Sequence, residues 1–293
     1  MPRLILLLFA GISAASTASI FIKLCDAPAL IIAAYRLVFA SLMLFPFAYH
    51  QRVWKGWSRT EVRWLVLSGI FLSLHFAFWI SSLKYTSVAS SVVLVSTHPI
   101  FVGIGSWLFL KERLGVNLIL GIGLSILGSV FISMGDMSLS KGAFFGDGLA
   151  LLGAITVSGY FLVGRKMRRG QNLLSYVFPV YATAGLALIL LAFLWQNPFF
   201  GYKSSNYLLF FLLALIPQLI GHTTFNWALK YIPASLVAIT ILGEPVGSTI
   251  LAFFILGEGL TLWKALWGIS IFMGILVALW RDKTIKRVSE KVL

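Results

Sequence analysis

One carboxylic acid lies deep in an apolar part of this chain. Glu244 stands between Gly243 and Pro245 near the middle of the apolar run 234–256, whereas the rest of the nine acidic residues lie at the ends of apolar runs or between them. A carboxylate in hydrocarbon is costly unless it is paired, protonated or hydrated. Pro245 lacks a backbone N–H and frees a carbonyl one turn earlier. The carboxyl group therefore either hydrogen bonds to this backbone or lines a cavity, where it binds a substrate amine or carries a proton.

A histidine occupies the equivalent position 146 residues earlier. His98 precedes Pro99 in the middle of the apolar run 87–109, as Glu244 precedes Pro245. A single histidine in an apolar helix is either a packing group with satisfied hydrogen bonds or a ligand for a solute. If both side chains face one cavity, they form a pair that holds a zwitterion or shares a proton.

Arg36 is the basic residue that falls within an apolar run. It lies about two turns of helix into the run 29–48. The guanidinium group stays protonated in proteins. Its side chain therefore extends to the lipid headgroups, pairs with Glu244, or contacts a carboxylate of a substrate.

Two further pairs of polar and aromatic side chains have helical spacing. His75 and Trp79 lie four residues apart, as do His222 and Asn226, so each pair shares one face of a helix. The two segments stand at equivalent places in an internal repeat, which predicts that both faces border one cavity. Trp79 offers a surface for stacking or for a cation–π contact, although an aromatic residue in a membrane helix more often meets lipid or another helix.

The composition places these residues in a membrane. The chain is 59% hydrophobic and 11% charged, with a mean hydropathy of +0.95, so it has too little polar surface to cover a soluble globule. A membrane-spanning helix needs about 20 mostly apolar residues. The sequence therefore predicts an all-α integral membrane protein with ten transmembrane helices: 4–23, 29–48, 62–82, 87–109, 115–134, 147–164, 174–195, 207–228, 234–256 and 261–280.

The two halves of the chain are related by an internal repeat. A shift of 146 residues superimposes the Leu-Lys-Tyr sequence that begins at Leu83 on the one that begins at Leu229. The same shift superimposes Glu112 on Glu258. Each of these acids ends a helix, and we expect it to have a structural role, paired with nearby arginine or lysine or with the N-terminus of the helix that follows. Because each half contains an odd number of helices, the second half enters the membrane from the opposite side, and such inverted repeats can open a cavity alternately to either side. We expect a first five-helix repeat, a linker, a second five-helix repeat and a basic tail over 1–135, 136–146, 147–281 and 282–293.

Several stretches resemble the EamA-type proteins of the drug/metabolite transporter superfamily. The run from Asn226 to Gly259, NWALKYIPASLVAITILGEPVGSTILAFFILGEG, is similar to their second repeat, and LKYTSVASSVVLVSTHPIFV from Leu83 is similar to their first. The resemblance implies ten helices in two inverted units, with helices 1 to 4 and 6 to 9 around a central cavity, and transport of a small metabolite. Ala15 departs from the family pattern, which has a tryptophan near this place, so the cavity wall differs here.

The basic residues indicate how the protein sits in the membrane. Most of the 23 lysine and arginine residues fall on the side where the chain begins, in clusters such as 52–63 and 165–169. Loops rich in these residues face the cytoplasm, which predicts a protein of the cytoplasmic (inner) membrane with both termini inside the cell. The formal charge of +14 therefore reflects topology, and its partner is the lipid bilayer rather than nucleic acid.

These features predict a secondary transporter of a small organic metabolite, an amino acid or related solute, that works by alternating access in the direction of efflux. Protons or an exchanged solute are the candidate driving partners. The alternative is an uptake or exchange carrier of a nucleoside-like or cationic metabolite, such as S-adenosylmethionine or a quaternary amine. We predict no catalytic residue and these substrate-binding residues: Glu244, His98, Arg36, Trp79, His75, Asn226 and His222.

Catalysis is the other class of function that a polar pair in the membrane could serve. An intramembrane enzyme would need a nucleophile with its base at helical spacing, and we find no such pair in the sequence. The four histidines have no metal-ligand spacing with cysteine or carboxylates. The sequence therefore predicts neither an enzyme nor a bound metal or cofactor.

Overall fold

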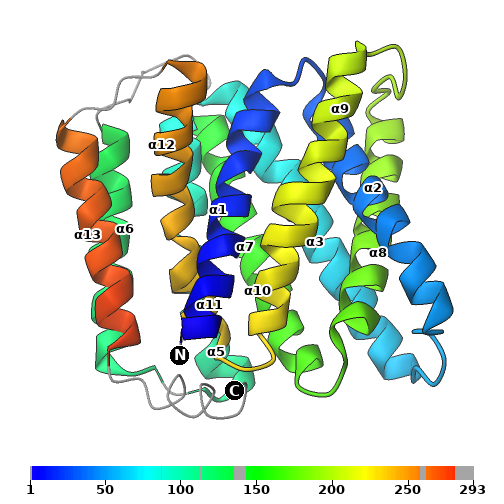
Figure 1. Ribbon diagram of the computed structural model, residues 1–293, viewed down its shortest axis with the longest axis horizontal. Coiled ribbons are helices and arrows are strands. Elements are labelled where there is room, and N and C mark those ends of the chain that lie inside the picture. Colours follow the sequence, from blue (N-terminus) through cyan, green and yellow to red (C-terminus); the bar gives the residue numbers. More distant parts are fainter. Residues whose placement is uncertain (1, 87, 113, 135–142, 258–261, 281–293) are drawn as a thin grey trace.

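The computed structural model of the chain describes residues 2–86, 88–112, 114–134, 143–257 and 262–280. These residues form a bundle of helices without a strand (Figure 1). The first half of the chain contains α1 (Pro2–Leu24), α2 (Ala29–His50), α3 (Arg59–Tyr85), α4 (Val88–Val95), α5 (His98–Leu110) and α6 (Val116–Met134). The second half contains α7 (Ala143–Arg168), α8 (Leu173–Leu194), α9 (Ser204–Leu213), the π-helix η1 (Ala214–His222), α10 (Thr223–Ala228), α11 (Ala234–Ile241), α12 (Gly243–Leu256) and α13 (Leu262–Leu279).

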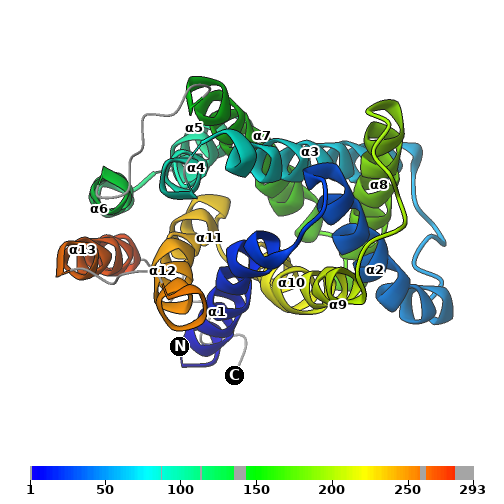
Figure 2. The same cartoon turned by 90° about the horizontal axis from the view of Figure 1, so that it is seen from above.

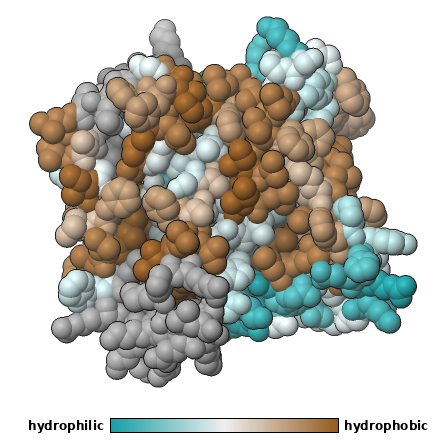
Figure 3. Space-filling model, in the orientation of Figure 1, coloured by the Kyte–Doolittle hydropathy of each residue, from teal (hydrophilic) through white to brown (hydrophobic). Residues whose placement is uncertain are grey.

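The described helices form ten crossings of the molecule. Among the described residues, seven helical segments are long and apolar enough to span a membrane, and three shorter apolar helices, in α5, α6 and α13, belong to the other crossings. Apolar side chains cover the middle of the face shown in Figure 3, with hydrophilic residues toward its upper and lower edges. The predicted all-α membrane fold is confirmed.

The two halves follow the same helical plan in opposite orientations. In Figure 1 the chain runs downward from α4 to α5 in the first half. In the second half it runs upward, from α11 near the bottom to α12. Both spans are interrupted just before a proline, at residues 96–97 and at Leu242. Both end in a residue with left-handed backbone, Lys111 (φ 54°) and Gly257 (φ 68°), which are 146 positions apart. The predicted inverted repeats are therefore confirmed.

We call the face where α1 begins and α13 ends the terminal face, and the other the opposite face. The connections that follow α2, α5, α7 and α10 lie at the terminal face, at the bottom of Figure 1. They carry several of the basic residues that the sequence assigns to one side: Arg52, Lys55, Lys111, Arg169 and Lys230.

α6 and α13 pack against each other at one edge of the bundle (Figure 2). Their backbones approach so closely that a Cβ atom at Gly121 would lie 2.5 Å from the carbonyl oxygen of Gly274. The Ser125 hydroxyl donates to the Ile271 carbonyl at 3.2 Å across the same contact. Small residues allow such close helix contacts, and with this pair at the edge, the other helices surround the middle of the bundle.

Candidate substrate site

A cavity lies between the two repeats, halfway along the helices. Its lining comes from α1, α2, α3, α4 and α5 of the first half and from α7, η1, α10, α11 and α12 of the second. The cavity is narrow, with a volume of about 60 Å³. Six of the seven predicted binding residues line it: Arg36, His75, Trp79, His98, His222 and Glu244.

Glu244 stands in the first turn of α12, directly after the break at Leu242. Its backbone carbonyl accepts a hydrogen bond from the Ser16 hydroxyl of α1 at 3.2 Å, and Gly247 lets the two helices come this close. Glu244 as a residue is partly buried, and its carboxyl group makes no hydrogen bond to any residue that the structure describes. The backbone that Pro245 frees therefore does not engage this carboxyl group, which lines the cavity instead.

His98 has a different relation to its proline. Because Pro99 has no N–H, the carbonyl of Val95 loses its usual helical partner. The Nδ1 atom of His98 lies 3.0 Å from this carbonyl oxygen, so Nδ1 carries the proton and donates it there. The other ring nitrogen, Nε2, is buried near the Ala238 backbone without a hydrogen-bond partner among the described residues.

Arg36 is buried in the bundle, with 1% of its surface exposed. Its Nε donates to Oε1 of Gln218 in η1 at 2.8 Å, and its guanidinium carbon lies 4.1 Å from the centre of the Phe76 ring. Its Nη1 is buried and has no partner in the described part of the chain. The side chain therefore does not extend to the lipid headgroups. One of its N–H groups remains available to a solute, and neither a hydrogen bond nor an ion pair joins it to Glu244 among the described contacts.

Aromatic rings form another side of the cavity. The rings of His75 and Trp79 are stacked, with centroids 5.9 Å apart and an interplanar angle of 7°. His75 Nδ1 is held by the Gly153 carbonyl at 3.0 Å, whereas Trp79 Nε1 is buried and unpartnered within the described residues. The rings of His222 and Phe76 form an edge-to-face contact, with their centroids 5.4 Å apart. These rings give a solute a flat apolar surface with one N–H donor.

Asn226 is the predicted binding residue that does not line the cavity. Its side chain is fully buried, and its amide nitrogen donates to the Tyr160 hydroxyl, to the Tyr181 hydroxyl at 3.3 Å and to the His222 carbonyl at 2.9 Å. Tyr160 belongs to α7 and Tyr181 to α8. Asn226 therefore joins α10 to two neighbouring helices and fixes the backbone beside His222.

The fold and the cavity can be compared with known proteins. A model of the EamA-like transporter family matches residues 2–134 and 144–280 of the chain. The chain belongs to the EamA-like transporter family. The two matched ranges correspond to the two inverted halves of the fold, so the family unit occurs twice in this EamA-like transporter.

Relatives along almost the whole chain are named as transporters. An uncharacterized transporter of Archaeoglobus fulgidus is 25% identical over 266 residues, which cover 91% of this chain and 92% of the relative. Solute carrier family 35 member G1 of Mus musculus is 28% identical over 76% of this chain and 64% of the relative. A solved crystal structure has the same fold, with a TM-score of 0.79 at 20% identity over 95% of this chain and 96% of that one. Family and relatives thus indicate a multi-pass membrane transporter rather than an enzyme.

Sequence reasoning missed Gln218 of this EamA-like transporter. Its side chain is completely buried, holds Arg36 by Oε1, and leaves Nε2 unpartnered among the described residues. It follows Pro217 within the π-helix η1. A neutral amide in an apolar run is a weak signal beside charged residues, and the equivalent position in the first half is Leu72, so the repeat gives no support. A search for every polar side chain in the predicted spans would have found it.

Replacement of Gln218 tests whether its amide stabilises the buried arginine. Gln218→Leu should lower the free energy of unfolding by about 1–3 kcal/mol, because Nε of Arg36 would lose its acceptor in a buried site. Thermal unfolding of the purified protein in detergent measures this change. Gln218→Glu is the matched control, since it keeps an oxygen acceptor and should be more stable than the leucine variant. If the leucine variant unfolds like the unsubstituted protein, the hydrogen bond has no stabilising role.

Proposed function

We propose that this EamA-like transporter carries a small zwitterionic metabolite, an amino acid or a close relative, by alternating access. The observation that supports this best is that one cavity contains both a guanidinium group and a carboxyl group, and that, among the described residues, Nη1 of the guanidinium has no partner and the carboxyl group has no hydrogen bond. Arg36 is suited to the carboxylate of a solute, and Glu244 to its amine. A solute with both groups would satisfy both side chains at once.

The remaining lining suits the rest of such a solute. The stacked rings of His75 and Trp79 provide a surface for an apolar side chain, and Trp79 Nε1 provides an N–H donor. A purely cationic solute would face Arg36 without compensation. The charges in the cavity therefore favour a solute with both a carboxylate and an amine over a cation without a carboxylate, such as a simple quaternary amine.

We infer from the basic loops that the terminal face is cytoplasmic and that the protein lies in the cytoplasmic membrane. Arg52, Lys55, Lys111 and Arg169 belong to connections at this face, and loops rich in lysine and arginine stay inside the cell. The gradients of the solute and of any coupled ion or exchanged solute set the direction of net transport. Efflux is therefore the expected direction wherever the cell accumulates the solute, and protons or an exchanged solute are the proposed driving partners.

Ligand-induced stabilisation of the purified protein tests the substrate class. The screen compares each amino acid with the amine that lacks its carboxylate and with the acid that lacks its amine. We expect the unfolding temperature to rise with at least one intact amino acid and to rise much less with either of its partners. Stabilisation by amines alone would support a cationic metabolite instead, and the absence of stabilisation by any amino acid would contradict the proposal.

A further inference from the structure

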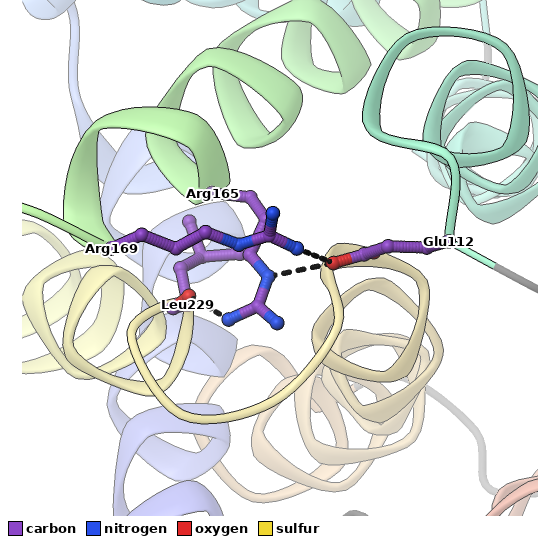
Figure 4. Close-up of polar contacts among 4 residues, drawn as sticks. All are labelled: Glu112, Arg165, Arg169 and Leu229. Carbon is purple, nitrogen blue, oxygen red and sulfur yellow. Dashed lines mark hydrogen bonds and ion pairs between the residues drawn. The ribbon is translucent and has the colours of Figure 1, made fainter.

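An ionic cluster joins the two repeats at the end of the cavity that points to the terminal face. Oε1 of Glu112, which follows α5, accepts from Arg165 Nε at 2.8 Å and from Arg169 Nη2 at 2.7 Å (Figure 4). Arg165 Nη1 also donates to the Leu229 carbonyl just after α10, at 2.6 Å. The expected pairing of Glu112 with arginine is thus confirmed, whereas its equivalent Glu258 lies outside the described residues.

The cluster lies one helical turn beyond the cavity on two of its helices. Phe161 of α7 and Phe225 of α10 line the cavity, and Arg165 and Leu229 follow them by four residues. Gly164 packs so closely on Leu229 that a Cβ atom on the glycine would lie 2.8 Å from a leucine methyl group. The cavity therefore ends at a tightly packed floor on the terminal side, and the ion pairs cross this floor.

A second cavity adjoins the other end of the first. It lies between the ends of α1 and α3 near the opposite face, and Ser19 belongs to the lining of both cavities. The Ser19 hydroxyl is buried without a partner among the described residues. The first cavity thus has a packed floor toward the terminal face and a neighbouring cavity toward the opposite face. The second cavity is lined by Ser19, Ile22, Lys23, Cys25, Ala27, Ile32, Ile80, Leu83 and Lys84.

The surroundings of Glu112 make its ion pairs strong and also reduce the cost of breaking them. The side chains of Glu112 and Arg165 are each 10% exposed, so water screens their attraction only weakly. A left-handed residue, Lys111, ends α5 and the Glu112 N–H donates to the Ser106 carbonyl at 3.0 Å, which fixes the direction of the acid. However, Oε2 of Glu112 is buried and unpartnered within the described chain. If the helices separated, water would reach this oxygen. Its hydration would offset part of the free energy lost when the ion pairs break.

We propose that Glu112, Arg165 and Arg169 form a gate that keeps the transporter closed at the terminal face. The cavity opens to this face when α5 separates from α7 and α10 and the ion pairs of Glu112 break. The gate rests on the proposed alternating access, because a protein with one fixed opening would need no releasable contact here. It can be tested without any substrate, so its failure would leave the proposed solute class untouched.

The test measures from which side a thiol reagent reaches the cavity. Cys25, the single cysteine, is replaced by serine, and Ser96, a buried cavity residue between α4 and α5, is replaced by cysteine. A membrane-impermeant charged methanethiosulfonate is applied to right-side-out and to inverted vesicles, with a tag at the N-terminus to report the terminal face. We expect Ser96→Cys to react from the opposite face. Added Glu112→Gln should raise its reaction rate from the terminal face by at least about tenfold.

Two control variants distinguish the opening of a gate from an unspecific loss of helix packing. Glu61→Gln makes the same chemical change near the terminal face, at a side chain bound to Ser58 and Gln171 outside the cluster, and it should leave the labelling from both faces unchanged. Arg169→Gln removes the more exposed partner, with 49% of its side chain accessible, and should have a smaller effect than Glu112→Gln. If Glu112→Gln leaves labelling from the terminal face unchanged, or Glu61→Gln raises it equally, the gate is wrong.

Discussion

Glu244→Gln is expected to lower transport of a zwitterionic amino acid on the order of 10- to 100-fold, the loss of one hydrogen bond to a charged group. The amide has the size of the carboxyl group but lacks the charge that binds a substrate amine or carries a proton. The carboxyl group accepts no hydrogen bond from the described residues, so its replacement leaves no known protein donor unpaired. Initial rates in proteoliposomes measure the effect, and thermal unfolding should show no loss of folded protein.

The same substitution should remove the pH dependence of transport. If the carboxylate binds an amine, transport by the unsubstituted protein falls as the medium is acidified from about pH 7 to about pH 4, because protonation removes the negative charge. The glutamine variant has no charge to lose at this position, so its rate should stay flat. A glutamine variant that transports at the normal rate across this range would rule out both the amine and the proton role of Glu244.

Arg36→Ala is expected to reduce transport of zwitterionic or anionic solutes by about 100-fold or more, and that of a cationic analogue without a carboxylate much less. Arg36 lines the cavity, and its buried Nη1 has no partner in the described part of the chain, so it is the group suited to a solute carboxylate. Competition assays with an amino acid and its decarboxylated amine measure the ratio of the two effects.

The ratio matters because Arg36 also supports the fold. Its Nε donates a hydrogen bond to Oε1 of Gln218, and its guanidinium group packs on the Phe76 ring. The alanine variant therefore loses some stability whichever solute is transported. A purely structural loss lowers transport of both solutes equally. Arg36→Lys keeps the charge without the planar fork and should retain part of the preference for solutes with a carboxylate.

The cavity could largely be predicted from the sequence because polar groups are rare in apolar runs. Glu244, His98 and Arg36 each stand within a predicted span, and the repeat relates the first two. The energetic penalty of such groups in lipid requires an interior location. Residues chosen for this reason line one cavity in the structure. Their contact with a substrate stays a prediction.

The division of roles within the cavity could not be predicted. The sequence treats His98 and Glu244 as equivalent, yet the His98 ring donates to the carbonyl that its proline frees, and Glu244 does not engage the backbone. Which side chain takes this role depends on the direction of each side chain, which spacing does not determine. The fully buried Gln218 was missed for the related reason that its partner, Arg36, lies 182 positions away in the chain.

Helical spacing was also an incomplete guide in the eighth predicted span. His222 and Asn226 are four residues apart at the start of α10, which follows η1. The residues of this segment that line the cavity are His222 and Phe225, while Asn226 points toward Tyr160 and Tyr181. Spacing gives the face of a helix but does not determine which of its side chains reaches the cavity.

Counterflow in reconstituted vesicles tests most directly whether the protein moves a zwitterionic solute. Vesicles are loaded with an excess of the amino acid that stabilises the purified protein best, and a trace of the labelled form is added outside. The account predicts saturable accumulation of unchanged label, slowed by Glu244→Gln and absent from vesicles without protein. Chemical conversion of the label without net transfer, or no accumulation of any amino acid that binds, would contradict it.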